Sequence, residues 1–412
     1  MQISLMRRMR ERYFRDLPSE VAALTGVSFC VALGFGIVAP IIPVFATTFD
    51  VSALAASSVI SVFAFMRFAS AAPAGWLVNK FGERAVLWTG LSIVAASSAL
   101  AGLSQSYGQL LVLRGLGGTG SSMFTVSAMS LLLRIVDVEH RGRAASTYQS
   151  GFLLGGLAGP AVGGLVVAFN LRAPFFVYAL TLTGAALVAY FKLPKGLGHP
   201  EHDERIKMDI GESMSLRSAL RLREYWTALM YNFTVGITSF GLRSALIPLY
   251  VVEVLRRGPS LSSLGFLASS VAQAAFMLSA GRTTDVRGRK RSMLIGTSAL
   301  LLAMGSIFFF ENLISFYTYM ALVGISAAFL SAGGAAMIGD IVAGRKGGQV
   351  VSTYQMTSDF GIVLGPVIAG YLRDSSGGYA LPFGFGLAVT FVFLIVVITS
   401  PETRDRNYLP KR

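Results

Sequence analysis

Four ionisable side chains interrupt otherwise apolar stretches of the sequence: Arg67, Arg114, Arg243 and Asp359. Ionisable groups in such surroundings normally face a polar cavity or the interior of a helix bundle, because lipid cannot solvate them. A guanidinium group can bind a carboxylate or a phosphate, and a carboxylate can take up and release a proton. These residues are therefore candidates for a solute cavity and for its coupling to an ion, in an interior where three cations outnumber one acid.

The elements that must position these residues are apolar segments about 20 residues long. The 412-residue chain is 53% hydrophobic and 14% charged, whereas soluble domains carry roughly 25% charged residues. A helix of about 20 apolar residues crosses a hydrocarbon core roughly 30 Å thick. The sequence therefore predicts an all-α, polytopic membrane protein with twelve transmembrane helices. The expected spans are residues 20–46, 53–79, 84–104, 108–134, 142–169, 173–191, 225–252, 261–284, 291–310, 313–342, 347–373 and 379–400.

The net charge of +14 is unevenly distributed along this pattern. If both termini are cytoplasmic, the cytoplasmic segments hold 28 of the 35 Lys and Arg residues, and the external loops hold only Arg172, Arg256, Arg257 and Arg373. Positive residues stay on the cytoplasmic side during insertion. We therefore expect both termini in the cytoplasm of a prokaryote, a location in its cytoplasmic (inner) membrane, and anionic lipid headgroups around the basic segments. A nucleic-acid partner is excluded.

An internal repeat divides the chain. The residues Ser146–Gln149 recur unchanged as Ser352–Gln355, an offset of 206. Such repeats build transporters with a solute site near the midplane between the halves. The predicted organisation is a six-helix half with a basic tail (1–191), a cytoplasmic linker (192–224) and a second six-helix half (225–412). The same offset relates further pairs: Gly75 and Gly281, Gly82 and Gly288, Gly155 and Gly361, Pro160 and Pro366, and Gly164 and Gly370.

The polar segments outside the spans show helical patterning. Around Ser215–Leu222 in the linker, apolar and basic residues alternate as in a short helix lying on the membrane interface. The basic N-terminal tail has a similar pattern. Both are predicted to anchor the chain at lipid headgroups.

Two loop segments, Gly75–Arg84 and Gly281–Lys290, occupy matching places in the two halves. Both resemble the loop signature of the major facilitator superfamily, Gly-x-Leu-x-Asp-Arg-x-Gly-Arg-Arg/Lys, and the resemblance covers essentially the whole predicted membrane region. It implies two halves that rock about a central site. It also implies that the loop acid latches the cytoplasmic side by meeting unpaired N–H groups at the start of a helix in the other half.

The first copy of the loop departs from this signature. Asn79 replaces the acid and Glu83 replaces a base, whereas Asp285 is retained in the second copy. We therefore expect an asymmetric latch, with Asp285 near Arg141–Ser146 and a weaker contact of Asn79 near Gly347–Gln349. The candidate latch residues are Asn79, Arg84, Asp285, Arg289 and Lys290.

The segment Arg114–Gly120 matches Gly-x-Gly-x-x-Gly at its glycines but lacks the βαβ context of a dinucleotide site. It resembles the fourth-span signature of the superfamily, whose Arg is associated with proton coupling. That resemblance implies that Arg114 faces the central cavity. The alternative is that Arg114, about 9 Å from the outer end of its span, reaches outward to the headgroups.

A stripe of small residues occupies the fifth span: Gly155, Gly159 and Gly163, with Pro160 beside it. This stripe lets helices approach closely, and the proline bends the helix. The segment is similar to the superfamily's antiporter signature, Gly-x-x-x-Gly-Pro-x-x-Gly-Gly. Its central pair is repeated at Gly365 and Pro366. The resemblance implies an antiporter-like helix bend.

Within the first span, the stretch Leu33–Pro43 resembles the first span of the twelve-helix drug:proton antiporter branch. Many members of that branch carry a carboxylate there, and the stretch Leu33–Pro43 has none. The difference argues against a strongly cation-selective pocket.

Arg67 and Asp359 are predicted to lie at one depth, since each is twelve residues, about 18 Å, from the cytoplasmic end of its span. The resemblance implies that these spans, the second and the eleventh, face each other. Two opposite charges at one level are costly alone and tolerable as a pair. We expect either an ion pair between the halves that protonation weakens, or two residues that face water or bond within their own halves.

These features predict a secondary active transporter, monomeric and without a cofactor. The favoured function is proton-coupled efflux (antiport) of small amphipathic or drug-like molecules by alternating access. The alternative is a proton-coupled uptake symporter for a small organic anion. An enzyme is not expected, because the spans hold no His-Glu-x-x-His and no Ser/His or paired-Asp constellation. No metal site is expected, and the single Cys30 cannot form an internal disulfide.

Overall fold

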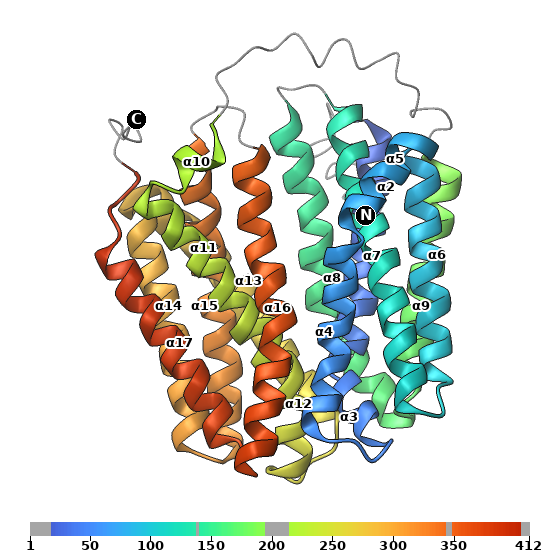
Figure 1. Cartoon of the computed structure of the whole chain (residues 1–412), viewed down its shortest axis with the longest axis vertical. Helices are drawn as coiled ribbons and strands as arrows, with labels where there is room; N and C mark the ends of the chain where they lie inside the picture. The colour runs from blue at the N-terminus through green and yellow to red at the C-terminus, as the bar shows by residue number, and fades with distance from the viewer. Residues whose placement is uncertain (1–17, 137–139, 194–213, 343–347, 405–412) are drawn as a thin grey trace, which may run out of the picture. The chain divides into compact units, whose positions relative to one another are not determined.

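The computed structural model describes residues 18–136, 140–193, 214–342 and 348–404 (Figure 1). The N-terminal tail and most of the linker, with their predicted headgroup contacts, lie outside these ranges. The linker helix expected around Ser215–Leu222 is present as α10 (Leu216–Ala219). No β-strand occurs within the described ranges, so the all-α prediction is confirmed.

The remaining helices follow the predicted spans in order. The first half contains α2 (Ser19–Val38), α3 (Ile42–Thr47), α4 (Ala53–Ala69), α5 (Ala71–Phe81), α6 (Glu83–Gly102), α7 (Tyr107–Ile135), α8 (Arg141–Phe169) and α9 (Ala173–Lys192). The second half contains α11 (Arg223–Val235), the π-helix η3 (Gly236–Leu242), α12 (Arg243–Glu253), α13 (Ser260–Arg287), α14 (Arg289–Phe309), α15 (Leu313–Val342), α16 (Gly348–Ser376) and α17 (Ala380–Thr399).

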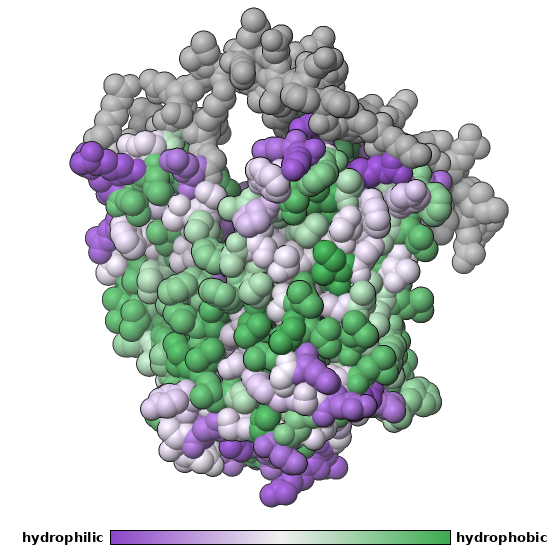
Figure 2. Space-filling view, turned by 45° about the vertical axis from the view of Figure 1, so that its right-hand side comes forward, coloured by the Kyte–Doolittle hydropathy of each residue, from purple (hydrophilic) through white to green (hydrophobic). Residues whose placement is uncertain are grey.

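Nine helical stretches in the described part of the chain are long and apolar enough to cross a membrane, and ten if the bent pair α4 and α5 counts as one. The helices α7 and α16, with 29 residues each, are also long enough to cross a membrane. On the face shown in Figure 2, hydrophobic residues occupy the middle and hydrophilic residues gather at the ends. This distribution is that of a bundle surrounded by lipid.

Two spans that the sequence presents as continuous are broken. The first is interrupted between α2 and α3, next to Pro40 and Pro43. The second bends by 46° between α4 and α5, three residues before Pro73. Each proline lacks the N–H that would bond to the carbonyl four residues earlier, so the helical ladder opens at these points.

The 206-residue repeat is visible in the backbone. The helices α14 and α15 begin 206 residues after α6 and α7, respectively. Both loop-signature glycines, Gly82 and Gly288, have positive φ angles of 81° and 106°, which side chains with a Cβ rarely adopt. The non-glycine residues with positive φ in the described ranges, Asp50 and Arg256, are again 206 positions apart.

The contacts divide the chain into two units. Unit 1 comprises residues 1–39 and 66–203, and unit 2 comprises residues 40–65 and 204–412. In unit 1, α2 packs on α8 and α9, and α6 packs on α7 and α9. In unit 2, α15 packs on α13 and α14, and α16 packs on α11 and η3. Residues 40–65, which precede the linker, pack in unit 2, where α3 contacts α12.

Candidate functional site

Arg114 is buried in unit 1, with only 3% of its surface exposed. It lies on α7, whose first turn is capped by Ser106, since the Ser106 side chain accepts a hydrogen bond from the backbone N–H of Gln109. The hydroxyl of Tyr178 on α9 is its electrostatic neighbour. The guanidinium group is therefore shielded from solvent and has a tyrosine of α9 as a neighbour. Its role in a solute path stays a prediction.

Arg243 has a comparable setting in unit 2. Its Nε donates to the carbonyl of Ser239 and its Nη1 to Oγ of Ser269 on α13, both at 3.1 Å. The guanidinium carbon lies 5.1 Å from the ring centre of Phe266, and Tyr319 is an electrostatic neighbour. In each unit a buried or half-buried arginine thus lies near a tyrosine.

Arg243 directly follows η3, a seven-residue π-helix. π-Helices are rare and often occur at functional sites. The backbone of η3 lies against α16: a Cβ at Gly236 would come within 2.6 Å of the Ser358 carbonyl oxygen, and one at Gly241 within 2.7 Å of the Gly365 Cα. Glycines are required at these two close approaches.

Arg67 and Asp359 fall in different units. Arg67 lies near the end of α4, in unit 1, and Asp359 lies within α16, in unit 2. Both side chains are half-buried. Their predicted ion pair is therefore a contact between units and stays a prediction.

The glycine stripe on α8 packs directly on α2. A Cβ at Gly155, Gly159 or Gly163 would lie 2.4, 2.6 or 2.9 Å from a carbonyl oxygen of α2. The helix continues through Pro160. In unit 2, Gly365 and Pro366 lie on α16, and a Cβ at Gly365 would lie 2.8 Å from the Cα of Gly241. The stripes therefore bring backbones into contact, and their part in antiport stays a prediction.

The first loop signature contains a buried ion pair that compensates for its unusual acid. Glu83 is 1% exposed, and its carboxylate lies 3.0 Å from the guanidinium group of Arg134 on α7. Ser130 also donates a hydrogen bond to this carboxylate at 3.1 Å. Arg84 donates to the backbone carbonyl of Tyr190 on α9, and Asn79 is exposed on unit 1. The acid at position 83 thus has a basic partner within its own unit.

In the second loop signature the base lies in the loop and the acid lies on the neighbouring helix. Arg289 forms a two-pronged pair with Asp340 on α15, at 2.8 and 3.1 Å. Glu402, just beyond α17, accepts hydrogen bonds from the backbone N–H groups of Arg289 and Lys290 at 2.8 and 3.1 Å and so caps α14. The Nζ of Lys290 donates to the carbonyl of Ile398.

Within the same loop, Asp285 is exposed on unit 2. The segment Arg141–Ser146 belongs to unit 1. The latch predicted for Asp285 would therefore join the two units and stays a prediction. The contact predicted for Asn79 involves Gly347, which lies outside the described ranges.

At the opposite end of unit 2, Asp374 caps α4. Its two carboxylate oxygens accept hydrogen bonds from the backbone N–H groups of Ala53 and Leu54, at 3.1 and 2.9 Å. A Cβ at Gly370, one turn earlier on α16, would lie 2.6 Å from the Cα of Leu54. The last turns of α16 thus contact the first turn of α4 through hydrogen bonds to a carboxylate and through a close approach of the two backbones.

An acid on α12 extends this end of the unit. Glu253 pairs with Arg373 of α16 and accepts a hydrogen bond from the Tyr379 hydroxyl at 2.9 Å. The guanidinium carbon of Arg373 in turn lies 5.7 Å from the ring centre of Tyr379. These three side chains therefore join the ends of α12 and α16 to the start of α17.

Five charged residues of these networks were not identified from the sequence: Arg134, Asp340, Glu402, Glu253 and Asp374. The sequence did contain one signal for two of them. The repeat offset of 206 relates Glu83 to Arg289 and Arg134 to Asp340, and at each of these two matched positions an acid in one half corresponds to a base in the other. The other three partners depend on how distant segments pack, and no short motif indicates them.

Comparisons with known proteins identify the family. The family model described as Major Facilitator Superfamily matches residues 24–268 and 232–412. Multidrug resistance protein 2 of Bacillus subtilis (strain 168) is 24% identical over 380 residues, covering 89% of this chain and 92% of the relative. Multidrug resistance protein MdtG of Proteus mirabilis (strain HI4320) is 26% identical over 396 residues, covering 92% and 95%.

Solved structures of the same fold are also similar. An inward-facing, unoccupied bacterial homolog of the human lysosomal transporter Spinster matches with a TM-score of 0.71 and 15% identity, covering 92% of this chain and 94% of the other. A mutant of the nucleoside transporter NupG matches with a TM-score of 0.72 and 12% identity, covering 92% and 98%. Twelve-helix fold, repeated loop signature and family match agree: the chain belongs to the major facilitator superfamily and is a membrane transporter, not an enzyme.

Proposed function

We propose that this transporter exports small amphipathic or drug-like molecules in exchange for protons. The observation that carries the proposal is the similarity to curated multidrug resistance proteins over about nine-tenths of both chains. The resemblance of α2 and of the α8 glycine stripe to the drug:proton antiporter branch also supports export in exchange for protons. The protein would act as a monomer in a prokaryotic cytoplasmic membrane, with both termini in the cytoplasm.

Coupling would use the ionisable groups inside the helices. Asp359 is the acid among the four original candidates, and Arg67, Arg114 and Arg243 are the cations. In the proposed cycle, protonation of Asp359 weakens its attraction to Arg67 and lets the two halves part. The buried environment of Arg114 supports a role inside the bundle.

Alternating access needs contacts that form at one end while others break at the other end. The contact of Asp374 with the start of α4 would serve at the external end. It joins the two halves of the sequence repeat, since α4 belongs to the first half and α16 to the second. Asp285 and Asn79 would serve at the cytoplasmic end. The outer contact would be made while the site faces inward and released when it faces outward.

A proton-coupled uptake symporter for a small organic anion is the second candidate. Two observations favour it: α2 contains no acid in its apolar part, and Arg114 and Arg243 provide cationic groups within the units. Such cations suit a carboxylate or a phosphate.

Proteoliposomes with imposed pH gradients of either sign separate the two functions. A panel of cationic dyes and organic acids would be tested for accumulation. Antiport moves the solute to the acidic side, whereas symport moves it to the alkaline side, whichever way the protein is inserted. Accumulation of dyes on the acidic side supports the proposal, and accumulation of an organic anion on the alkaline side would replace it with the second candidate.

A further inference from the structure

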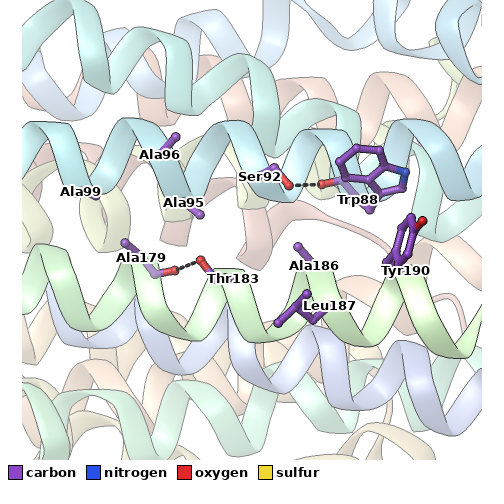
Figure 3. A pocket seen from close by; sticks show the side chains of 10 residues that line it. All are labelled: Trp88, Ser92, Ala95, Ala96, Ala99, Ala179, Thr183, Ala186, Leu187 and Tyr190. Carbon is purple, nitrogen blue, oxygen red and sulfur yellow. Dashed lines mark hydrogen bonds between the residues drawn. The ribbon is translucent and has the colours of Figure 1, made fainter.

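A groove of about 470 Å³ runs between α6 and α9 on unit 1 (Figure 3). Small side chains shape it, among them Ala95, Ala96 and Ala186. The hydroxyls of Ser92 and Thr183 bond to carbonyls of their own helices, Trp88 and Ala179, both at 2.8 Å. Because these polar atoms are already satisfied, the groove offers apolar surface and suits a hydrocarbon chain better than a polar solute.

One end of the groove is aromatic and basic. Trp88 and Tyr190 meet edge to face there, with ring centres 5.8 Å apart. Beyond them, the guanidinium carbon of Arg84 lies 5.1 Å from the Tyr190 ring centre, and Lys192, the last residue of α9, is exposed. The acid present in α6 and α9, Glu83, is buried in its pair with Arg134. Within α6 and α9, this end therefore presents the positive charges of Arg84 and Lys192 and no other acid.

The groove is as long as one leaflet is deep. It extends from Trp88 to Ala99 on α6 and from Tyr190 to Ala179 on α9, eleven residue-to-residue steps on each helix. At 1.5 Å per residue this is about 16 Å, close to half of the roughly 30 Å hydrocarbon core. Trp and Tyr favour the membrane–water interface, so the aromatic pair marks the headgroup level and the alanines mark the acyl region.

We propose that this groove binds one glycerophospholipid with an anionic headgroup, from the leaflet at the Arg84 end. One acyl chain lies along the small residues of α6 and α9. The phosphate lies at Arg84 and Lys192, where each cation contributes on the order of 1 kcal/mol of attraction to an anionic surface. This site is separate from the four ionisable candidates for the solute cavity and does not depend on the transported molecule.

The test is native mass spectrometry of the delipidated full-length protein, titrated with phosphatidylglycerol or phosphatidylcholine of identical acyl chains. The wild type should retain one phosphatidylglycerol more tightly than phosphatidylcholine. Arg84→Gln and Lys192→Gln should each weaken phosphatidylglycerol binding about fivefold. The matched control Lys80→Gln, on α5 and over the Trp76 ring, should leave it unchanged.

A second arm fills the groove. Ala96→Phe and Thr183→Leu replace exposed lining residues and should remove the tightly bound lipid. Gly184→Leu on the same helix, where an added Cβ meets open space, should not. Equal retention of the two lipids by the wild type would overturn the headgroup assignment, and unchanged lipid binding in both filled variants would overturn the groove as the site.

Discussion

The carboxylate of Glu83 lies 3.0 Å from the guanidinium group of Arg134, at positions where the second half of the chain has the same pair with its charges exchanged. There, Arg289 on α14 contacts Asp340 on α15 at 2.8 Å. The unusual acid in the first loop signature is therefore one member of an inverted pair and not a lost interaction. Each half keeps an acid and a base between matching helices, and only their order differs.

Exchanging the charges of this pair should restore what single substitutions remove. Glu83→Arg and Arg134→Asp each place like charges together, one of them at a site that is 1% exposed. Breaking a buried pair costs roughly 3–5 kcal/mol, and the 32% exposure of Arg134 reduces this figure. The double variant should recover most of the loss, measured as thermal unfolding in detergent. A double variant no more stable than the worse single variant would contradict the pairing.

Removing the cap of α14 should loosen the start of that helix. Glu402→Ala deprives the N–H groups of Arg289 and Lys290 of their acceptor. A cap of this kind contributes about 1 kcal/mol, so hydrogen exchange of the Arg289–Met293 amides should become about fivefold faster. Ser375→Ala, a change in a hydroxyl that bonds only within α16, is the control, and identical exchange in both variants would exclude the cap.

Loss of the Asp374 contact should favour opening at the start of α4. Hydrogen bonds to a charged acceptor contribute about 1.5–3 kcal/mol each, so Asp374→Ala should raise the open population at least about tenfold. The measurement is the rate at which an impermeant maleimide labels a cysteine placed at the buried Ser57 of α4, in a Cys30→Ser background. Ser375→Ala should label like the parent, and no acceleration in Asp374→Ala would remove it from the external contact.

Neutralising Asp359 should separate transport from the proton. We expect Asp359→Asn to abolish solute accumulation driven by a pH gradient while solute binding survives, and Arg67→Ala to behave similarly. Proton flux in dye-quenching assays and equilibrium solute binding would be measured together. Full coupling in Asp359→Asn would rule out the proposed role of this carboxylate.

Arg114→Gln should impair coupled transport strongly, because the side chain is buried in unit 1. A guanidinium group that merely reached the headgroups would be dispensable. Arg172→Gln provides the comparison, since Arg172 lies at the start of α9 and bonds to the carbonyl of Gly102. Coupled transport retained in Arg114→Gln would remove this residue from the candidate site.

The spans, the repeat and the packing glycines could be predicted because each leaves a pattern in the sequence. The spans are long apolar stretches, the repeat has a fixed offset, and the glycines recur every four residues. The caps supplied by Glu402 and Asp374 could not, because they depend on how segments more than 100 residues apart meet. The helix breaks near Pro40 and Pro73 were also missed, because the spans were predicted from the length of their apolar stretches. That length does not change where a proline lacks the N–H needed for one helical hydrogen bond. The pairing of Arg67 with Asp359 still requires the two units to be placed relative to each other.

The π-helix η3 changes the rotational phase of the seventh span. On α2, the close contacts with Gly159 come from Leu33 and Gly36, three residues apart, whereas on η3 the contacts with Gly365 come from Ile237 and Gly241, four apart. The π-helix thus holds one residue more than its counterpart. Since a residue corresponds to about 100° of helix rotation, deleting Ser239 and restoring an α-helix would turn Arg243 by about that angle, away from Ser269. The extra residue sets the direction in which this arginine points.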